Sequence, residues 1–125
     1  MSLMNDFRTM IQTELSKIEN LNCGKIISDD AIQVGTFHYG YEVSSSVLSK
    51  SIGYDNDNMI LTITGYLTTK GDTLKKFDDF TDSICEALSK LNVKTTTQDI
   101  TTYDTTRKAL ISGTVILNTL DKTLR

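Results

Sequence analysis

Residues 59–68 read MILTITGYLT, and the period of this stretch decides the fold. Its apolar side chains alternate with threonines at positions 62, 64 and 68. Because successive side chains of a strand point to opposite faces, the alternation predicts a β-strand with one buried face and one wetter face. The predicted buried face carries Met59, Leu61, Ile63 and Leu67.

A turn at 69–73 follows, and then the period changes. Between Leu74 and Leu91 the apolar residues recur at three- and four-residue steps, the spacing of one side of an α-helix. Asp72 or Thr73 can cap the first turn of this helix. Its apolar stripe consists of Leu74, Phe77, Thr81, Ile84, Cys85, Leu88 and Leu91.

Before this strand, the sequence predicts a helix that begins at Asn5 or Asp6 and ends in residues 20–24. Residues 25–27 are a short strand candidate. A further strand is predicted around residues 37–43, where large apolar residues alternate with His38, Gly40 and Glu42. The helix stripe is Phe7, Met10, Ile11, Leu15 and Ile18, and the strand face is Phe37, Tyr39, Tyr41 and Val43.

A serine run at 44–46 leads into residues 47–54, which we expect to form a strand or an extended arm. The sequence DNDN at 55–58 is a turn signal that would join this arm to the strand at 59 as a hairpin. Beyond the second helix, Asn92 closes a turn. Residues 93–102 are threonine-rich and predict an edge strand, residues 103–108 a loop, and residues 109–119 the last strand, before a polar tail at 120–125.

The predicted order is therefore α-β-β-β-α-β-β, which indicates an α+β fold. We expect a single mixed or antiparallel sheet with both helices packed on its apolar face, and a long hairpin arm. The chain has 125 residues, which is the size of one domain. Residues 1–3 resemble an expression-vector remnant, so the domain is expected to span residues 4–125.

Composition excludes several classes of protein. A formal net charge of −3 and the lack of a basic stripe argue against nucleic-acid binding. No apolar run is long enough to span a membrane, and no secretory signal is evident. A reduced cytosolic setting is expected, in which Cys85 is a buried structural thiol and Cys23 lies in a loop.

No constellation of residues predicts catalysis, a metal or a cofactor. His38 is the only histidine, and its spacing indicates neither a catalytic triad nor a zinc site. The stretch at 55–58 lacks the later ligands of an EF-hand. Acidic residues gather on the polar side of the second helix, which we interpret as a solvated or partner-facing surface. These residues are Asp78, Asp79, Asp82 and Glu86.

The whole-chain pattern resembles the small tail-terminator proteins of long-tailed bacteriophages and prophages, which also complete the tail and join it to the head. The resemblance covers residues 5–120. It is carried by the amphipathic first helix, the serine-rich hairpin, the strand at 59–66 that runs into the helix at 74–91, and the turn at 103–108 before the closing strand at 109–117.

This resemblance implies a non-enzymatic structural protein that forms a ring, commonly of six subunits, on the end of the tail tube. Its partners would be further copies of itself, the tail tube protein and the head–tail connector protein, without direct specific binding of nucleic acid or membrane. It would lie in the bacterial cytoplasm during assembly and then in the virion. The ring would be held by a heterologous, closing interface.

Six residues of the predicted loops are candidates for subunit or tail-tube contacts, since tyrosine and arginine are favoured interface anchors. They are Lys50, Tyr54, Asp55 and Asp57 in the hairpin and Tyr103 and Arg107 in the late loop. Ordinary exposed loop is the other interpretation of the same residues. Other functions also stay open: a different phage neck or tail-tube module, a small ligand-binding domain with a pocket beside the aromatic strand, or an enzyme.

Overall fold

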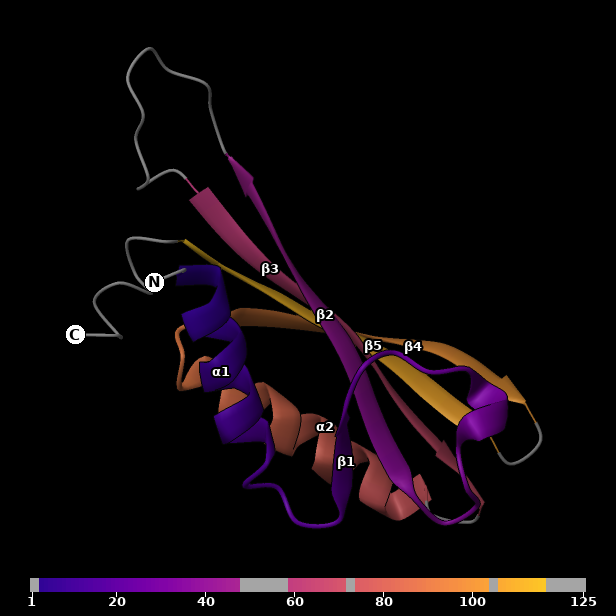
Figure 1. Cartoon of the computed structure of the whole chain (residues 1–125). Coiled ribbons are helices and arrows are strands. Elements are labelled where there is room, and N and C mark those ends of the chain that lie inside the picture. The colour runs from indigo at the N-terminus through magenta and orange to yellow at the C-terminus, as the bar shows by residue number, and fades with distance from the viewer. Residues whose placement is uncertain (1–2, 48–58, 72–73, 104–105, 117–125) are drawn as a thin grey trace, which may run out of the picture.

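The computed structural model describes the backbone of residues 3–47, 59–71, 74–103 and 106–116, and the side chains of 5–45, 60–71, 76–100 and 106–115. The element order is the predicted one (Figure 1). The elements are α1 (Leu3–Leu15), β1 (Leu21–Gly24), the 3-10 helix η1 (Asp29–Ala31), β2 (Phe37–Val47), β3 (Met59–Lys70), α2 (Leu74–Ser89), β4 (Lys94–Tyr103) and β5 (Thr106–Ile116).

The five strands form one mixed sheet in the order β1-β2-β3-β5-β4. β1 pairs in parallel with β2, and only along Phe37–Gly40. The other three pairings are antiparallel. The prediction of an α+β fold with a single mixed or antiparallel sheet is therefore confirmed, and β4 is the edge strand that its threonine content predicted.

Both helices lie on the same face of this sheet (Figure 1). The buried face of β3 is the predicted one, because Leu61, Ile63 and Leu67 are all buried. Burial of one such side chain stabilises a fold by about 1.5–3 kcal/mol. The helices contribute mostly residues of their predicted stripes to the same core: Phe7, Ile11 and Leu15 from α1, and Phe77, Ile84, Ala87 and Leu88 from α2.

The aromatic face of β2 also points into this core. Tyr39 is fully buried, and its hydroxyl donates a hydrogen bond to the carbonyl of Ile111 on β5, 2.8 Å away. The ring reaches β5 by crossing β3 above Gly65, where a Cβ atom would lie 2.6 Å from Tyr39 Cε1. Glycine at position 65 is therefore required by this close approach.

The second face of the sheet is partly covered by the segment that connects β1 to β2. His38 Nε2 lies 3.1 Å from the Lys25 carbonyl, and Lys108 Nζ lies 3.1 Å from Asp29 Oδ1. Thr68 pairs with both His38 and Lys108 in the sheet, and it is 4% exposed. The prediction that Thr68 lies on a wet face was therefore wrong, because residues 25–29 cover that end of the sheet.

The first strand lies at Leu21–Gly24 and not at residues 25–27. Residues 21–24 pair with β2, and this pairing places Leu21 and Cys23 against the core. Cys23 therefore lies in a strand rather than in the predicted loop. Ile26 and Ile27, which favoured the other assignment, are 43% and 40% exposed.

Several element ends also differ from the prediction. α1 begins at Leu3 and ends at Leu15, and Ile18 packs against the core from the following turn. β2 continues through the serine run, β3 continues to Lys70, and residues 106–108 belong to β5. Backbone hydrogen bonds to antiparallel neighbours extend these strands through stretches whose side chains are polar.

Candidate interaction surfaces

The structure describes only part of the predicted contact set. Lys50, Tyr54, Asp55 and Asp57 lie outside the described residues. Tyr103 is the last residue of β4, and its side chain is outside the described part as well. These residues therefore stay predictions, and Arg107 alone can be placed.

Arg107 lies near the start of β5, in β-strand rather than loop conformation, and makes contacts within its own chain. Its Nη2 atom is 3.5 Å from Asp78 Oδ1 on α2 and 3.6 Å from Asp99 Oδ2 on β4. Its guanidinium carbon is 4.5 Å from the centre of the Phe77 ring. The side chain is 22% exposed. Its contacts therefore connect α2 with β4 and β5.

The four acidic residues of α2 are all exposed, in agreement with a polar helix face. Asp78 pairs with Arg107 at the start of the helix. Asp79 and Glu86 border a groove, which we call the helix groove. All four carboxylates face water.

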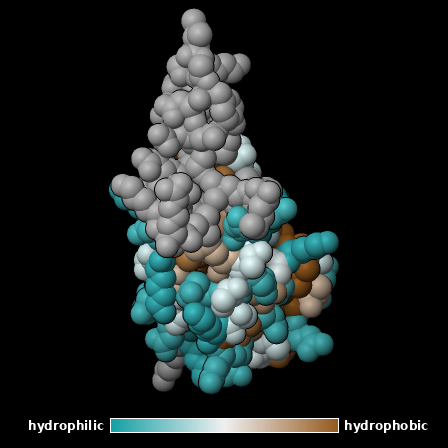
Figure 2. Space-filling model, turned by 60° about the vertical axis from the view of Figure 1, so that its left-hand side comes forward, coloured by the Kyte–Doolittle hydropathy of each residue, from teal (hydrophilic) through white to brown (hydrophobic). Residues whose placement is uncertain are grey.

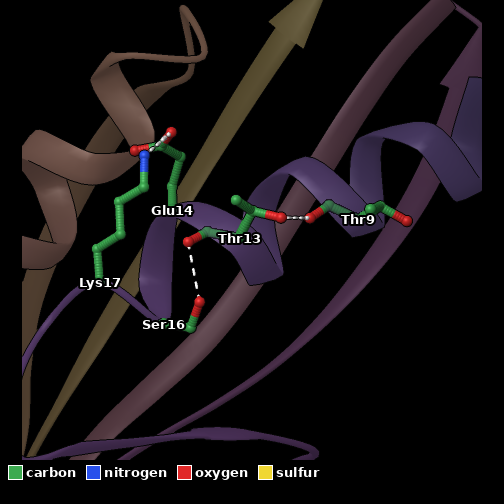
Figure 3. Close-up of polar contacts among 5 residues, drawn as sticks. All are labelled: Thr9, Thr13, Glu14, Ser16 and Lys17. Atoms are coloured by element: carbon green, nitrogen blue, oxygen red, sulfur yellow. Dashed lines mark hydrogen bonds and ion pairs between the residues drawn. The ribbon is translucent and has the colours of Figure 1, made fainter.

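The helix groove has a volume of about 1070 Å³ and is open to solvent. It lies between α2 and the segment that follows α1, and the start of β2 borders it. Glu14 and Lys17 stand at its rim, joined by a 3.0 Å ion pair (Figure 3). The other charged residues that line it are Glu19, Lys76, Asp79, Glu86 and Lys90, so both signs of charge are present.

A second, smaller hollow of about 540 Å³ lies on the other side of α1, which we call the edge groove. It is lined by Tyr41 and Val43 of β2, by Gly24 at the end of β1, and by α1. The Tyr41 hydroxyl donates to Gln12 Oε1 at 2.7 Å and so ties β2 to α1 here. The α1 residues that line this groove are Arg8, Thr9, Gln12 and Thr13.

Two residues on the α1 wall of the edge groove use their hydroxyls within the helix. The Thr9 hydroxyl donates to the Asn5 carbonyl and the Thr13 hydroxyl to the Thr9 carbonyl, each 2.9 Å away, and Figure 3 shows the second of these bonds. A threonine hydroxyl that is bonded to its own helix leaves the side-chain methyl as its other contact group. The wall therefore presents the methyl groups of these two threonines beside the polar side chains of Arg8 and Gln12.

Within the described residues, β2 is unpaired on its β1 side from Tyr41 onward, because β1 ends opposite Gly40. Figure 1 shows β2 and β3 extending together well past β1. One hydrogen bond fixes the direction in which the backbone groups of each strand point. The Gly35 N–H donates to the Lys70 carbonyl at 2.7 Å, so the backbone carbonyl of Lys70 points toward the β2 side of β3.

Backbone groups of successive residues point to alternate sides of a strand, so the even-numbered residues of β3 point toward β2. The register pairs Glu42 with Thr64, so the backbone N–H and C=O groups of even-numbered β2 residues point toward β3. The backbone groups of odd-numbered β2 residues therefore point away from β3. The same alternation continues through β5 to β4. The backbone groups of odd-numbered β4 residues point away from β5, up to the bulge at Asp99/Thr101. Among the described strands, the outward N–H and C=O groups without a strand partner include those of Tyr41, Val43 and Ser45 on β2 and of Thr95 and Thr97 on β4.

The sequence predicted the β4 edge but not the β2 edge. Whether a strand edge is paired depends on the position and length of the neighbouring strand. The sequence assigned the strand before β2 to residues 25–27 instead of Leu21–Gly24, so the unpaired part of β2 could not be predicted. The exposed surface in the view of Figure 2 is mostly hydrophilic, with small hydrophobic areas.

The half-buried Cys23 and the buried Tyr39 have raised pKa values, and burial also raises the pKa of Tyr41. Burial raises the pKa of the Cys23 thiol to about 11, and Cys23 is a free cysteine, as is Cys85. Burial, with smaller contributions from Cys85, Cys23 and Tyr41, raises the pKa of Tyr39. Cys23 and Tyr39 are held in their neutral forms and face the core.

The described residues contain no cluster of three or more His, Cys, Asp or Glu side chains that could hold a metal ion. Among the described helices, none has the length and hydropathy needed to cross a membrane. Comparison of the chain with protein-family models, with curated proteins and with solved structures gives no match.

Proposed function

We propose that this protein is a structural subunit that assembles into a closed ring, in the manner of a tail terminator that caps a phage tail tube and joins it to the head connector. The observation that supports the proposal best is the pair of different unpaired sheet edges, one on β4 and one on β2 beyond β1. Two different edges suit a heterologous interface, and heterologous interfaces generate rings when the rotation closes.

Features that restrict strand pairing at both edges support the same proposal. Unpaired strands in soluble proteins risk uncontrolled pairing, which is usually limited by charges, bulges or short lengths. β4 carries a bulge at Asp99/Thr101, and α1 borders the β2 edge. Both devices limit which strands can pair there, as a subunit that assembles in one geometry requires.

The test is the mass of the protein in solution, measured by light scattering over a concentration series, with electron microscopy of the same samples. We expect closed rings, with six subunits as the leading number. Tail tubes with and without the protein provide a second arm, in which rings should occupy one tube end. A monomer that neither assembles nor binds tube ends would contradict the proposal.

The predicted hairpin contacts can be examined in the same assay. Tyr54→Ala and Lys50→Ala should weaken binding to tube ends if the hairpin is the contact. Lys90→Ala, directly after α2 and away from the hairpin in sequence, is the matched control. Equal binding by all three variants would remove the hairpin from the proposed interface.

A ligand-binding domain is the second candidate function, favoured by the volume of the helix groove. The aromatic strand contributes little to it, because Phe37 is 3% exposed and Tyr39 is fully buried. A screen of small charged and aromatic compounds by thermal shift, repeated with Glu14→Gln and Lys76→Gln, would test this function. Binding that the substitutions abolish would favour it over the ring.

A further inference from the structure

The helix groove contains one carboxylate whose two oxygens have different surroundings. Glu14 Oε1 accepts a hydrogen bond from Lys17 Nζ at 3.0 Å (Figure 3). Glu14 Oε2 is buried and has no hydrogen-bond partner among the described residues. A buried acceptor without a donor is unfavourable, and more so when the group is charged. The groove therefore holds an acceptor that an incoming donor would satisfy.

The partner that Glu14 already has is easily displaced. The Lys17 side chain is 62% exposed, and exposed ion pairs contribute little to stability. Its ammonium is a compact charge that contacts one oxygen of the carboxylate. The terminal torsion of a glutamate side chain is soft. Once Lys17 moves into solvent, a turn of the Glu14 carboxylate can bring Oε2 toward the groove.

A guanidinium matches this carboxylate better than an ammonium does. Its planar fork donates two parallel hydrogen bonds, so it satisfies both oxygens of one carboxylate. It also stacks on aromatic rings. Phe80 of α2 lines the same groove and is half-buried, with its ring centre 4.4 Å from that of Phe37. The groove therefore offers a fixed aromatic surface as well as the carboxylate.

The charges that line the groove also favour a cation. Four carboxylates and three lysines line it, so moving Lys17 into solvent leaves four carboxylates and two lysines. Among the described residues, the pair between Glu14 and Lys17 is the one ion pair in this groove. The other carboxylates are Glu19, Asp79 and Glu86, and the other lysines are Lys76 and Lys90.

We propose that the helix groove binds a guanidinium group, with Glu14 as its anchor and Lys17 as the cation that it displaces. This inference rests on the second candidate function, ligand binding in the helix groove, and names the group that is bound. Small guanidino compounds and the arginine side chains of proteins carry the same group, and probes of both kinds separate these two sources.

The test measures binding of argininamide to the whole chain by isothermal titration calorimetry. Lysinamide carries an ammonium in place of the guanidinium, and citrullinamide has the shape of argininamide without the side-chain charge. We expect argininamide to bind about fivefold more tightly than lysinamide, and citrullinamide to show no saturable binding. Equal affinities of argininamide and either of the other two probes would overturn the assignment of a guanidinium.

Glu14→Gln tests the anchor, because it keeps the size of the side chain and removes its charge. Binding of argininamide should weaken about tenfold. Glu86→Gln changes the charge of an exposed residue on the same groove in the same way, so it is the matched control and should change the affinity by less than about twofold. Equal effects of the two substitutions would exclude Glu14 as the anchor.

Lys17→Ala tests the displacement and does not depend on the folding of Glu14→Gln. Removal of the resident cation should strengthen binding of argininamide about threefold. Lys90→Ala removes the same charge from the same groove and should have a smaller effect. The melting temperature of each variant monitors folding. Unchanged or weaker binding by Lys17→Ala would contradict the displacement and with it the proposal.

A short peptide with capped ends and one central arginine identifies the source of the group. Tighter binding of this peptide than of argininamide supports an arginine of a protein partner, and weaker binding supports a small guanidino compound. If all guanidinium probes fail while other compounds bind in the groove, the guanidinium is wrong and ligand binding stands. If no compound binds, both are wrong. The mass in solution tests the ring separately.

Discussion

The ring of Tyr39 occupies the space above Gly65 that any other side chain at position 65 would fill. A Cβ atom there would lie 2.6 Å from Tyr39 Cε1. The contact joins β2 to β3, and the Tyr39 hydroxyl extends it to Ile111 on β5. Three central strands are thus locked by one buried side chain.

Gly65→Ala should therefore lower the free energy of unfolding by about 1–3 kcal/mol, the usual cost of overpacking a core. Urea denaturation measures this change. Gly24→Ala is the matched control, because nothing lies within 4 Å of a Cβ atom at Gly24. Equal stability of the two variants would show that Tyr39 moves aside without cost.

Tyr39→Phe keeps the ring and removes its hydrogen bond to Ile111. We expect a loss of about 1 kcal/mol in the free energy of unfolding, typical for one intramolecular hydrogen bond. Tyr41→Phe removes a bond of 2.7 Å to Gln12 at an exposed site, where water can replace it, and should cost less. The reverse order of the two losses would contradict this ranking.

Alkaline pH should destabilise the protein. The folded state raises the pKa of Cys23 to about 11 and also raises that of Tyr39, whereas the ordinary values are about 8.5 for cysteine and about 10 for tyrosine. The unfolded chain therefore loses these protons first, and stability that is present at neutral pH declines above about pH 8.5.

Unfolding measured at several pH values tests the assignment of this decline. In Cys23→Ala, the free energy of unfolding should depend less on pH between about pH 8.5 and 11. In Tyr39→Phe, it should depend less on pH above about pH 10. Asn22→Ala, an exposed position on β1 without a titratable side chain, serves as the control. Curves parallel to that of the unsubstituted protein would show that neither group causes the decline.

Arg107→Met should destabilise the single subunit, because Arg107 contacts Phe77 as well as two carboxylates. We expect a loss of about 1 kcal/mol, mainly from the ring contact, because exposed ion pairs contribute little. Lys90→Met, at an exposed position on the helix groove, is the control. No loss in the monomer, together with weakened assembly, would return Arg107 to the list of interface anchors.

The sequence predicted those elements in which the spacing of apolar residues shows directly which side chains are buried. The alternation at 59–68 and the three- and four-residue steps at 74–91 predicted β3 and α2 and most of the side chains that they bury. The threonine-rich stretch after Asn92 predicted the β4 edge strand. In each case side chains of one short segment share one environment, so the segment's own pattern carries the information.

Tertiary structure decided the features that depend on partners distant in sequence. Leu21–Gly24 became β1 because Phe37–Gly40 pairs with it, Thr68 became buried because residues 25–29 cross over it, and Arg107 was drawn to Phe77 and Asp99. The open β2 edge follows from the shortness of β1. The sequence alone determined the elements with a long period of their own, such as β3 and α2, because their side chains share one environment. Packing between segments determined which residues form β1, where the strands end, what covers them and which edges stay free.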